Sequence, residues 1–255
     1  MKLQGEVALV TGGARRIGAA IARACAAEGA AVVVHYHRSK ADAQSLVEEL
    51  RASGFQAWAV RGDLAKAKDR GGILHEARKA AGAPVTLLVN NASSYPESRV
   101  ANLGLDDLQA ALEVNAWAPF ALTRTFAEEL PDGRFGSVVN LVDARVADYD
   151  WSHVGYWLAK RMLADLTRGC AIEFAPRGAV NGVSPGAVLG PSNQPMSAAQ
   201  EAEFLQRMAK HIPLRRTPTP QDIAETVVHL LASRTITGTV IDVDGGRHLG
   251  RAVYG

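Results

Sequence analysis

The chain has 255 residues, 47% of them hydrophobic, and its 28 basic and 26 acidic side chains leave a formal net charge of +2. This length predicts a single domain over residues 1–255, and so small a charge argues against nucleic acid or a membrane surface as partner. The two cysteines, Cys25 and Cys170, lie in apolar helical patterns, which predicts free thiols in a reducing compartment. Because Glu6 interrupts any signal-like segment and no later apolar run could span a membrane, we expect a soluble, cytoplasmic protein.

Short β-branched runs alternate with longer helical patterns along the chain. The runs predict strands at residues 7–10, 31–36, 57–61, 85–90, 137–142, 179–183 and 239–243. Apolar residues that recur every three or four positions predict helices at residues 17–28, 41–52, 69–81, 106–130, 154–174 and 221–232. Because the strands are continuously apolar, the pattern predicts an α/β fold: a Rossmann-like, doubly wound, seven-stranded parallel sheet with helices on both faces.

A glycine-rich turn follows the first expected strand. Residues 11–18 read T-G-G-A-R-R-I-G and then enter a helix. Glycines permit a tight turn and close approach to a pyrophosphate, which the free N–H groups of a helix amino terminus attract. An ordinary strand-to-helix turn is the alternative, but the place of the motif in the first β-α unit favours a dinucleotide site.

The second expected strand ends in a basic segment, H-Y-H-R-S-K at residues 35–40. An NAD-binding chain usually carries an acid here for the ribose hydroxyls, whereas in this chain the first acid is Asp42. His37, Arg38 and Ser39 offer a cation and donors to a 2′-phosphate, which predicts NADPH rather than NADH. A solvated basic turn is the alternative. The two histidines of the segment have no third ligand nearby, so no metal site is expected.

Tyr156 and Lys160 lie four residues apart and therefore on one face of the expected helix at residues 154–174. The ammonium is expected to lower the pKa of the phenol and make Tyr156 a better proton donor or acceptor. Asp143 follows the fifth expected strand, and its negative charge should oppose that effect. Its oxygens can accept hydrogen bonds from a substrate that offers N–H groups, which a ketone does not.

These motifs resemble the short-chain dehydrogenase/reductase family over nearly the whole chain, as far as D-V-D-G-G at residues 242–246. The resemblance implies a catalytic group of Asn115, Tyr156 and Lys160, with Asp63-Leu64 and N-N-A-S at residues 90–93 lining the cofactor cleft. Two positions depart from the family: Asp143 stands where a serine is usual, and Arg16 stands at the middle glycine. Both departures, together with S-S-Y at residues 93–95, resemble the pteridine reductases.

This second resemblance implies NADPH-dependent hydride transfer that reduces a dihydropterin to a tetrahydropterin, with dihydrofolate as a further candidate substrate. Tyr95 is expected to stack on the pterin, Asp143 to orient it, and Tyr156 to supply a proton. Lys160 is expected to hold the nicotinamide ribose, and Asn115 to anchor a water linked to Lys160. The expected substrate-binding residues are Arg16, Ser93, Tyr95, Asp143 and Tyr156, with Arg16 and Ser93 bridging phosphates and substrate. The expected cofactor-binding residues are Gly12, Arg15, Arg16, Ile17, Gly18, Tyr36, His37, Arg38, Ser39, Asp63, Leu64, Asn91, Ala92, Ser93, Lys160, Pro185 and Gly186.

The Gly-, Pro- and Ser-rich segment at residues 185–195 is expected to form a lid that leads to a short helix, within a substrate loop at about residues 185–212. Two other functions stay open: an NADPH-dependent carbonyl reductase of a 3-oxoacyl, keto ester or sugar substrate, and a non-catalytic NADP-binding regulator. The resemblance also implies a homotetramer, with apolar faces of the helices at residues 110–126 and 154–174 as candidate interfaces.

Overall fold

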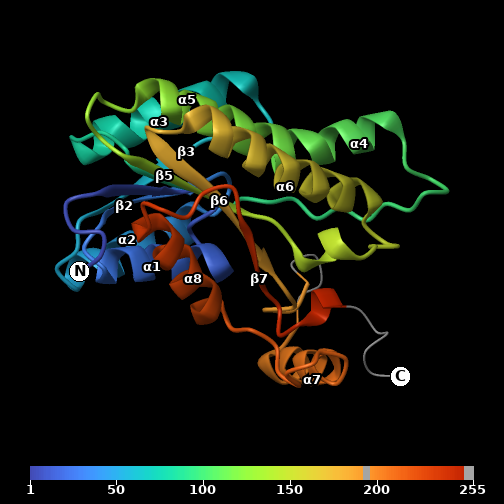
Figure 1. The fold of residues 1–255 in the computed structure, drawn as a ribbon. Coiled ribbons are helices and arrows are strands. Elements are labelled where there is room, and N and C mark those ends of the chain that lie inside the picture. Colours follow the sequence, from blue (N-terminus) through green and yellow to red (C-terminus); the bar gives the residue numbers. More distant parts are fainter. Residues whose placement is uncertain (192–195, 250–255) are drawn as a thin grey trace.

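The computed structural model describes residues 1–191 and 196–249. Within these ranges the strands form one seven-stranded parallel sheet in the order β3-β2-β1-β4-β5-β6-β7 (Figure 1). The expected fold class is therefore confirmed. The strands are β1 (Val7–Val10), β2 (Ala31–Tyr36), β3 (Ala57–Arg61), β4 (Leu87–Asn90), β5 (Gly136–Leu141), β6 (Gly178–Pro185) and β7 (Val240–Val243).

Helices cover both faces of the sheet (Figure 1). One face packs against α1 (Arg16–Ala27), α2 (Lys40–Ala52) and α8 (Pro220–Ala232). The other packs against α3 (Ala67–Ala81), α5 (Ala118–Glu129) and α6 (Val154–Phe174). Neighbouring residues of one strand enter different clusters, because side chains alternate between the faces. Both faces being buried explains why the strands are continuously apolar.

The strand order reverses beside β1, which pairs with β2 on one side and β4 on the other. The segments after β1 and β4 are tied together at this point. The Thr11 N–H donates to the Val89 carbonyl at 2.9 Å, and Asn91 Nδ2 donates to the Thr11 carbonyl at 2.8 Å. Ligands of open α/β sheets bind at such a reversal, beyond the carboxyl ends of the strands.

One continuous helix was expected at residues 106–130, and this was wrong because the helix is interrupted. α4 (Leu105–Leu112) is followed by a π-helical turn, η1 (Glu113–Trp117), before α5 begins. Pro119 has no N–H to donate to the carbonyl of Asn115 four residues earlier. The Asn115 side chain in turn donates to the Ala111 carbonyl at 3.0 Å. The break in the helical ladder therefore falls on an expected catalytic residue.

The expected substrate loop contains α7 (Ala198–Ala209), which is longer than the short helix expected. Ser197 and Gln200 form a capping box at its start, and no residue of α7 is buried. Residues 192–195 of the expected lid lie outside the described residues. Both cysteines are free thiols, Cys25 buried and Cys170 half-buried. Among the described helices, none has the length and hydropathy needed to cross a membrane.

Candidate active site

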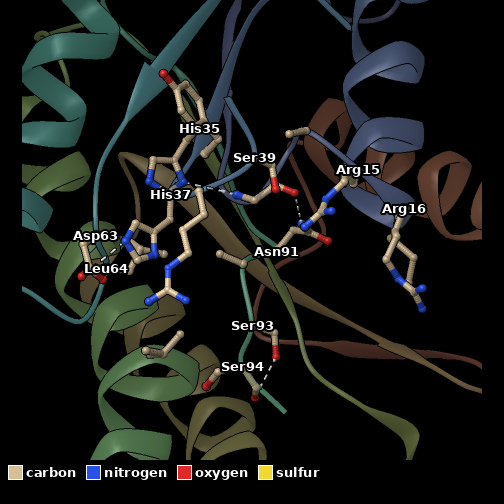
Figure 2. A pocket seen from close by; sticks show the side chains of 18 of the residues that line it. Arg15, Arg16, His35, His37, Ser39, Asp63, Leu64, Asn91, Ser93 and Ser94 are labelled. Carbon is tan, nitrogen blue, oxygen red and sulfur yellow. Dashed lines mark hydrogen bonds and ion pairs between the residues drawn. The ribbon is translucent and has the colours of Figure 1, made fainter. Parts of the chain in front are cut away.

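The turn after β1 and the segments after β2, β3 and β4 surround one cavity of about 660 Å³ (Figure 2). Its wall contains most of the expected cofactor-binding residues: Gly12, Arg15, Arg16, Ile17, Gly18, Tyr36, His37, Arg38, Ser39, Asp63, Leu64, Asn91, Ala92 and Ser93. Lys160, Pro185 and Gly186 do not contribute to this wall. Residues that sequence reasoning missed also line it: Ala14, His35, Ala65, Ser94 and Val114.

The glycine-rich turn has the shape that a phosphate cradle needs. Gly12 has φ +60°, and a Cβ there would lie 2.9 Å from Ala92 Cα. A Cβ at Gly18 would lie 2.3 Å from the Gly12 carbonyl oxygen. Arg15 precedes α1 without capping it by a side-chain hydrogen bond, so the first N–H groups of α1 stay available to an anion. These features fit the pyrophosphate of a dinucleotide.

Arg16 adopts φ +54°, the left-handed region that favours glycine. Its guanidinium donates to the carbonyl of Gly190, and the Gly190 N–H donates to Glu201 Oε1 on α7 at 2.6 Å. Arg16 therefore lies in the cavity wall and also holds the segment that follows β6. The expected bridge from Arg16 to phosphate and substrate stays a prediction.

The basic segment after β2 lies at one end of the cavity, next to Asp63 (Figure 2). His37 Nε2 lies 3.6 Å from Asp63 Oδ2, and Arg15 Nε lies 3.6 Å from Asp42 Oδ2. Arg38 is exposed at this end. Arg15, His37 and Arg38 thus lie at the same end of the cavity, with Asp42 and Asp63 beside them.

His35 is a buried structural residue of this wall. The Gly12 N–H donates to its Nδ1 at 3.3 Å, and its Nε2 pairs with the Gly62 carbonyl at 3.2 Å. Burial lowers the pKa of His35 to about 4, so the imidazole is neutral at neutral pH, with its proton on Nε2. Both ring nitrogens are used in holding the turn after β1 against the segment after β3.

The segment after β4 is held by the side chain of Asn115. Asn115 Oδ1 accepts hydrogen bonds from Ser93 Oγ at 2.7 Å and from the Ser94 N–H at 3.0 Å. Its Nδ2 donates to the Ser94 carbonyl at 3.0 Å. The Asn115 side chain therefore holds the segment after β4, and its expected link to a water and Lys160 stays a prediction.

Asp143, Tyr156 and Lys160 come together beyond the end of β5. The Tyr156 hydroxyl donates to Asp143 Oδ2 at 2.8 Å, and Lys160 Nζ donates to the Leu141 carbonyl at 2.6 Å. Lys160 Nζ lies 5.7 Å from the centre of the Tyr156 ring, and both side chains are buried. The expected proximity of the phenol, the ammonium and the carboxylate is present in the fold.

The net shift of the Tyr156 pKa is opposite to the lowering expected from Lys160, and Asp143 opposes that lowering as expected. Burial, followed by the Asp143 carboxylate bonded directly to the hydroxyl, raises the pKa of Tyr156 well above its usual value. Burial also lowers the pKa of Lys160 to about 8, although Asp143 acts against this shift. The carboxylate touches the phenol, whereas the ammonium bonds the backbone instead. Tyr156 is therefore a protonated phenol, suited to donate rather than to accept a proton.

Tyr95 lies beside the catalytic group, in a cluster that sequence reasoning missed. Its ring stacks on His153, with centroids 3.6 Å apart, and meets the Tyr156 ring edge-on at 4.7 Å. Its hydroxyl contacts Arg145 and Asp150. The only sequence signal was the crowding of charged residues at 143–153, which has no helical or strand period.

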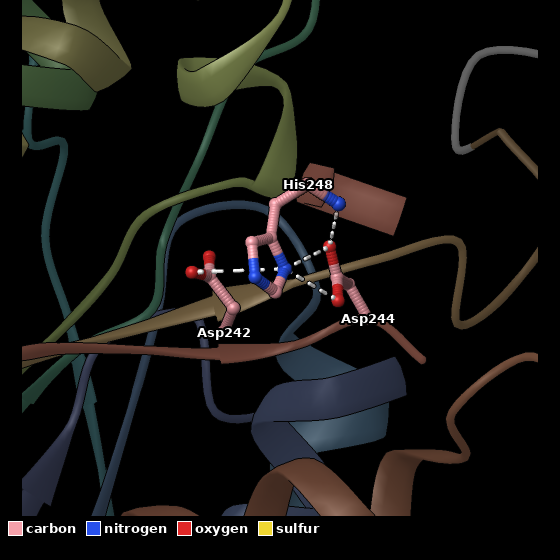
Figure 3. Close-up of side chains that lie close together, drawn as sticks. All are labelled: Asp242, Asp244 and His248. Carbon is pink, nitrogen blue, oxygen red and sulfur yellow. Dashed lines mark hydrogen bonds and ion pairs between the residues drawn. The ribbon is translucent and has the colours of Figure 1, made fainter. Parts of the chain in front are cut away.

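Three side chains that could bind a metal ion lie close together at the end of β7: Asp242, Asp244 and His248. Their possible ligand atoms are within 4.8 Å of one another (Figure 3). Asp244 accepts hydrogen bonds from the Gly246 and His248 N–H groups, and His248 Nδ1 lies 3.0 Å from its Oδ1. These contacts account for the cluster as a cap on the turn into η3 (Arg247–Leu249).

The sequence matches a family model described as enoyl-(acyl carrier protein) reductase over residues 12–248. Pteridine reductase 1 of Leishmania tarentolae is 34% identical over 292 residues, which cover 96% of this chain and 97% of that protein. The 3-oxoacyl-(acyl-carrier-protein) reductase FabG of Staphylococcus epidermidis is 31% identical over 245 residues, which cover 95% of this chain and 98% of that protein.

Solved structures resemble the fold just as completely. FolM alternative dihydrofolate reductase 1 from Brucella canis, crystallised with NADP, matches with a TM-score of 0.89 at 34% identity, covering 98% of this chain and 96% of that one. A blue fluorescent protein from a metagenomic library, in complex with NADPH, matches with a TM-score of 0.85 at 32% identity, covering 97% of this chain and 99% of that one.

Proposed function

Since a family model matches residues 12–248 and relatives above 30% identity span nearly the whole chain, this protein belongs to the short-chain dehydrogenase/reductase family, and we propose that it is an NADPH-dependent pteridine reductase. Its reaction is the reduction of a dihydropterin to a tetrahydropterin, with dihydrofolate as a further candidate substrate. Both the pteridine reductase and the FolM relative support this substrate class.

The observation that carries the proposal is the carboxylate of Asp143, which receives the Tyr156 hydroxyl at 2.8 Å. An ionised carboxylate accepts hydrogen bonds and cannot donate them, so it suits a substrate that offers ring N–H and amino groups. A ketone oxygen beside the same carboxylate gains no hydrogen bond. Each Asp143 oxygen already accepts one hydrogen bond, from Tyr156 or from the Arg145 N–H, and retains capacity for another.

The cofactor of the proposed reaction is NADPH, which supplies a hydride when bound. The glycine turn and the start of α1 would hold its pyrophosphate, and Arg38 with His37 and Ser39 would hold the 2′-phosphate. Asp63 and Leu64 would meet the adenine, and Asn91 to Ser93 would line the path toward the catalytic group. Pro185 and Gly186 would close the cleft beyond β6.

The chain's residues then provide orientation and the proton. Tyr156 is protonated at neutral pH and donates a proton to the nitrogen of the C=N bond, directly or through a water that it positions. Asp143 orients the ring through its N–H groups, and Tyr95 stacks on it. Lys160 Nζ, which spends one N–H on Leu141, has others for a ribose hydroxyl. The carbon gains the hydride and the nitrogen gains the proton, so the reduction balances.

A second candidate function is the reduction of a 3-oxoacyl thioester. It is favoured by the FabG relatives, which span almost as much of the chain as the pteridine reductase does. Asn115, Tyr156 and Lys160 serve such a reaction equally well. Asp143 is the residue that separates the two candidates.

The deciding experiment follows NADPH oxidation with dihydrobiopterin, dihydromonapterin and dihydrofolate beside a simple β-ketoester. Turnover confined to the pterins is expected, and turnover confined to the ketoester would refute the proposal. The variants Tyr156→Phe and Asp143→Ala should each lose most turnover while NADPH binding, measured by quenching of protein fluorescence, survives. The proposal includes a homotetramer in the cytoplasm.

A further inference from the structure

The ring of Tyr95 is fixed on three sides. Its hydroxyl donates to Asp150 Oδ2 at 3.0 Å and accepts from Arg145 Nη1. The His153 ring lies flat against one face, at 3.6 Å and 14°, and the Tyr156 ring meets it at 88°. A side chain with this many contacts keeps its orientation before any ligand arrives.

Asp150 anchors the group from within the protein. Its carboxylate is 8% exposed and pairs with Arg145 through Oδ2. Its Oδ1 accepts from the Ser152 N–H at 3.0 Å and pairs with His153 Nδ1 at 3.2 Å. One carboxylate therefore holds both stacked rings and the arginine together.

Arg145 connects this group to the proton donor. Its N–H donates to Asp143 Oδ1 at 2.8 Å, and its carbonyl accepts from Trp157 Nε1 on α6 at 3.0 Å. The same residue thus touches the catalytic carboxylate through its backbone and the Tyr95 hydroxyl through its side chain. Arg145 and its partner Asp150 therefore connect the Tyr95 ring to the carboxylate that bonds Tyr156.

We propose that Arg145, anchored by Asp150, is the specificity-determining residue of this site, because it holds Tyr95 as a rigid aromatic wall that favours flat heteroaromatic substrates over open-chain ketones. The inference rests on the proposed function. A wall that is already ordered gives up no rotamer freedom when a planar ring stacks on it. An open-chain ketone has no ring to stack and gains nothing from the wall. Arg145 is a positioning residue, since it acts through Tyr95.

The ionisation states of the group support this role. Burial raises the pKa of Tyr95 to about 12, against the effect of the Arg145 cation, so its phenol stays neutral and can donate to Asp150. Burial disfavours the Arg145 cation, but Asp143, Tyr95 and Asp150 outweigh burial and raise its pKa above the usual value. Tyr95 and Arg145 therefore keep their charge states across the pH range of an assay.

The test compares Tyr95→Phe, which keeps the ring and removes the hydroxyl, with Arg145→Met and with the double variant. Each single variant should raise KM for the dihydropterin about tenfold and change kcat less than about twofold. The double variant should be no worse than the poorer single variant, because both changes release the same contact. Arg145→Lys keeps the positive charge but lacks the planar guanidinium. Its KM for the dihydropterin should lie between those of the wild type and Arg145→Met.

Arg161→Met is the matched control, since this exposed arginine on α6 lies over Trp157 and not over Tyr95. It should leave both KM and kcat unchanged, and the thermal unfolding of every variant checks that the fold is kept. Additive losses in the double variant would overturn the inference, as would an equal loss toward the β-ketoester and the pterin.

A failure of the proposed function can be told apart from a failure of this inference. If the wild-type protein reduces only the ketoester, the proposed function fails. The inference is then tested by the inhibition constant of an oxidised pterin against ketoester reduction. Tyr95→Phe and Arg145→Met should weaken that inhibition about tenfold, and unchanged inhibition would overturn the inference.

Discussion

At the scale of single residues, the proposed role of Asp143 is to select the substrate, and its carboxylate also opposes ionisation of Tyr156. Its carboxylate bonds the Tyr156 hydroxyl at 2.8 Å and, after burial, is the strongest influence that raises the pKa of that phenol. A serine at this position would donate a hydrogen bond to a carbonyl and would carry no charge. The same substitution should therefore change substrate preference and pH dependence together.

The variant Asp143→Ser tests this link. The catalytic efficiency (kcat/KM) with the dihydropterin should fall about a hundredfold, and reduction of a β-ketoester should appear or increase. Because the carboxylate no longer raises the Tyr156 pKa, the alkaline limit of the pH–rate profile should move to lower pH. Asp148→Ser, at an exposed carboxylate nearby, is the control and should leave the profile unchanged. A profile that stays the same in Asp143→Ser would contradict the assignment.

His35 provides a residue-scale prediction for stability. Burial lowers its pKa from the ordinary 6.5 to about 4, so the unfolded chain binds more protons than the folded one between these values. Stability is then lost as pH falls through this window, by about 2 kcal/mol between pH 7 and pH 5. Urea unfolding at the two pH values measures the loss. His35→Asn removes the titrating group, so an equally large loss in that variant would mean that other groups cause it.

At the scale of elements, we expect the segment after β2 to set the choice of cofactor. Arg38 is exposed at one end of the cavity, where we propose that the 2′-phosphate binds. Arg38→Asp should raise KM for NADPH at least about tenfold and lower KM for NADH, because the new carboxylate repels the phosphate and accepts from ribose hydroxyls. Lys40→Asp, two residues on at the start of α2, should have little effect on either. An unchanged KM for NADPH in Arg38→Asp would show that this segment is only a solvated turn.

The elements themselves followed closely from sequence. The ends of β1, β2, β3 and α6 agree with the expected ranges, because each apolar run is bounded by turn residues. The interruption at residues 113–117 did not follow, since apolar residues recur on both sides of it and the pattern was taken as one continuous helix. Pro119 was the available signal.

The candidate site followed from sequence only where a motif fixed the chain locally. The glycine turn and the Tyr156–Lys160 pair are of this kind. The contact between the segment after β4 and residues 150–153 could not be predicted from a local motif. It depends on two irregular segments that pair through a single β-bridge between Ser98 and His153. The direction of the Tyr156 pKa shift also needed the structure, since burial and the Asp143 distance decide it.

At the scale of the whole molecule, the parallel sheet brings every part of the site to one edge. The carboxyl ends of β1 to β4 line the cavity, Asp143 follows β5, and α6 carries Tyr156, the proposed proton donor. The outer layer on the sheet face covered by α5 and α6 also includes α4 and η1. Three large apolar side chains are exposed on η1 and α6: Trp117, Met162 and Ile172. Such side chains on one layer are expected where subunits associate.

The proposed homotetramer predicts that this layer is an interface, with Trp117 inside it. Its side chain is 40% exposed and packs near Phe120, with ring centroids 5.4 Å apart. Trp117→Glu would bury an unpaired carboxylate between subunits, so the dissociation constant of the tetramer should rise more than about tenfold and smaller species should appear by sedimentation velocity. Leu214→Glu, at a 64% exposed leucine between α7 and α8 and outside these helices, should leave the tetramer intact. A wild-type monomer would refute the assembly, and a Trp117→Glu tetramer as stable as the wild type would move the interface to another surface.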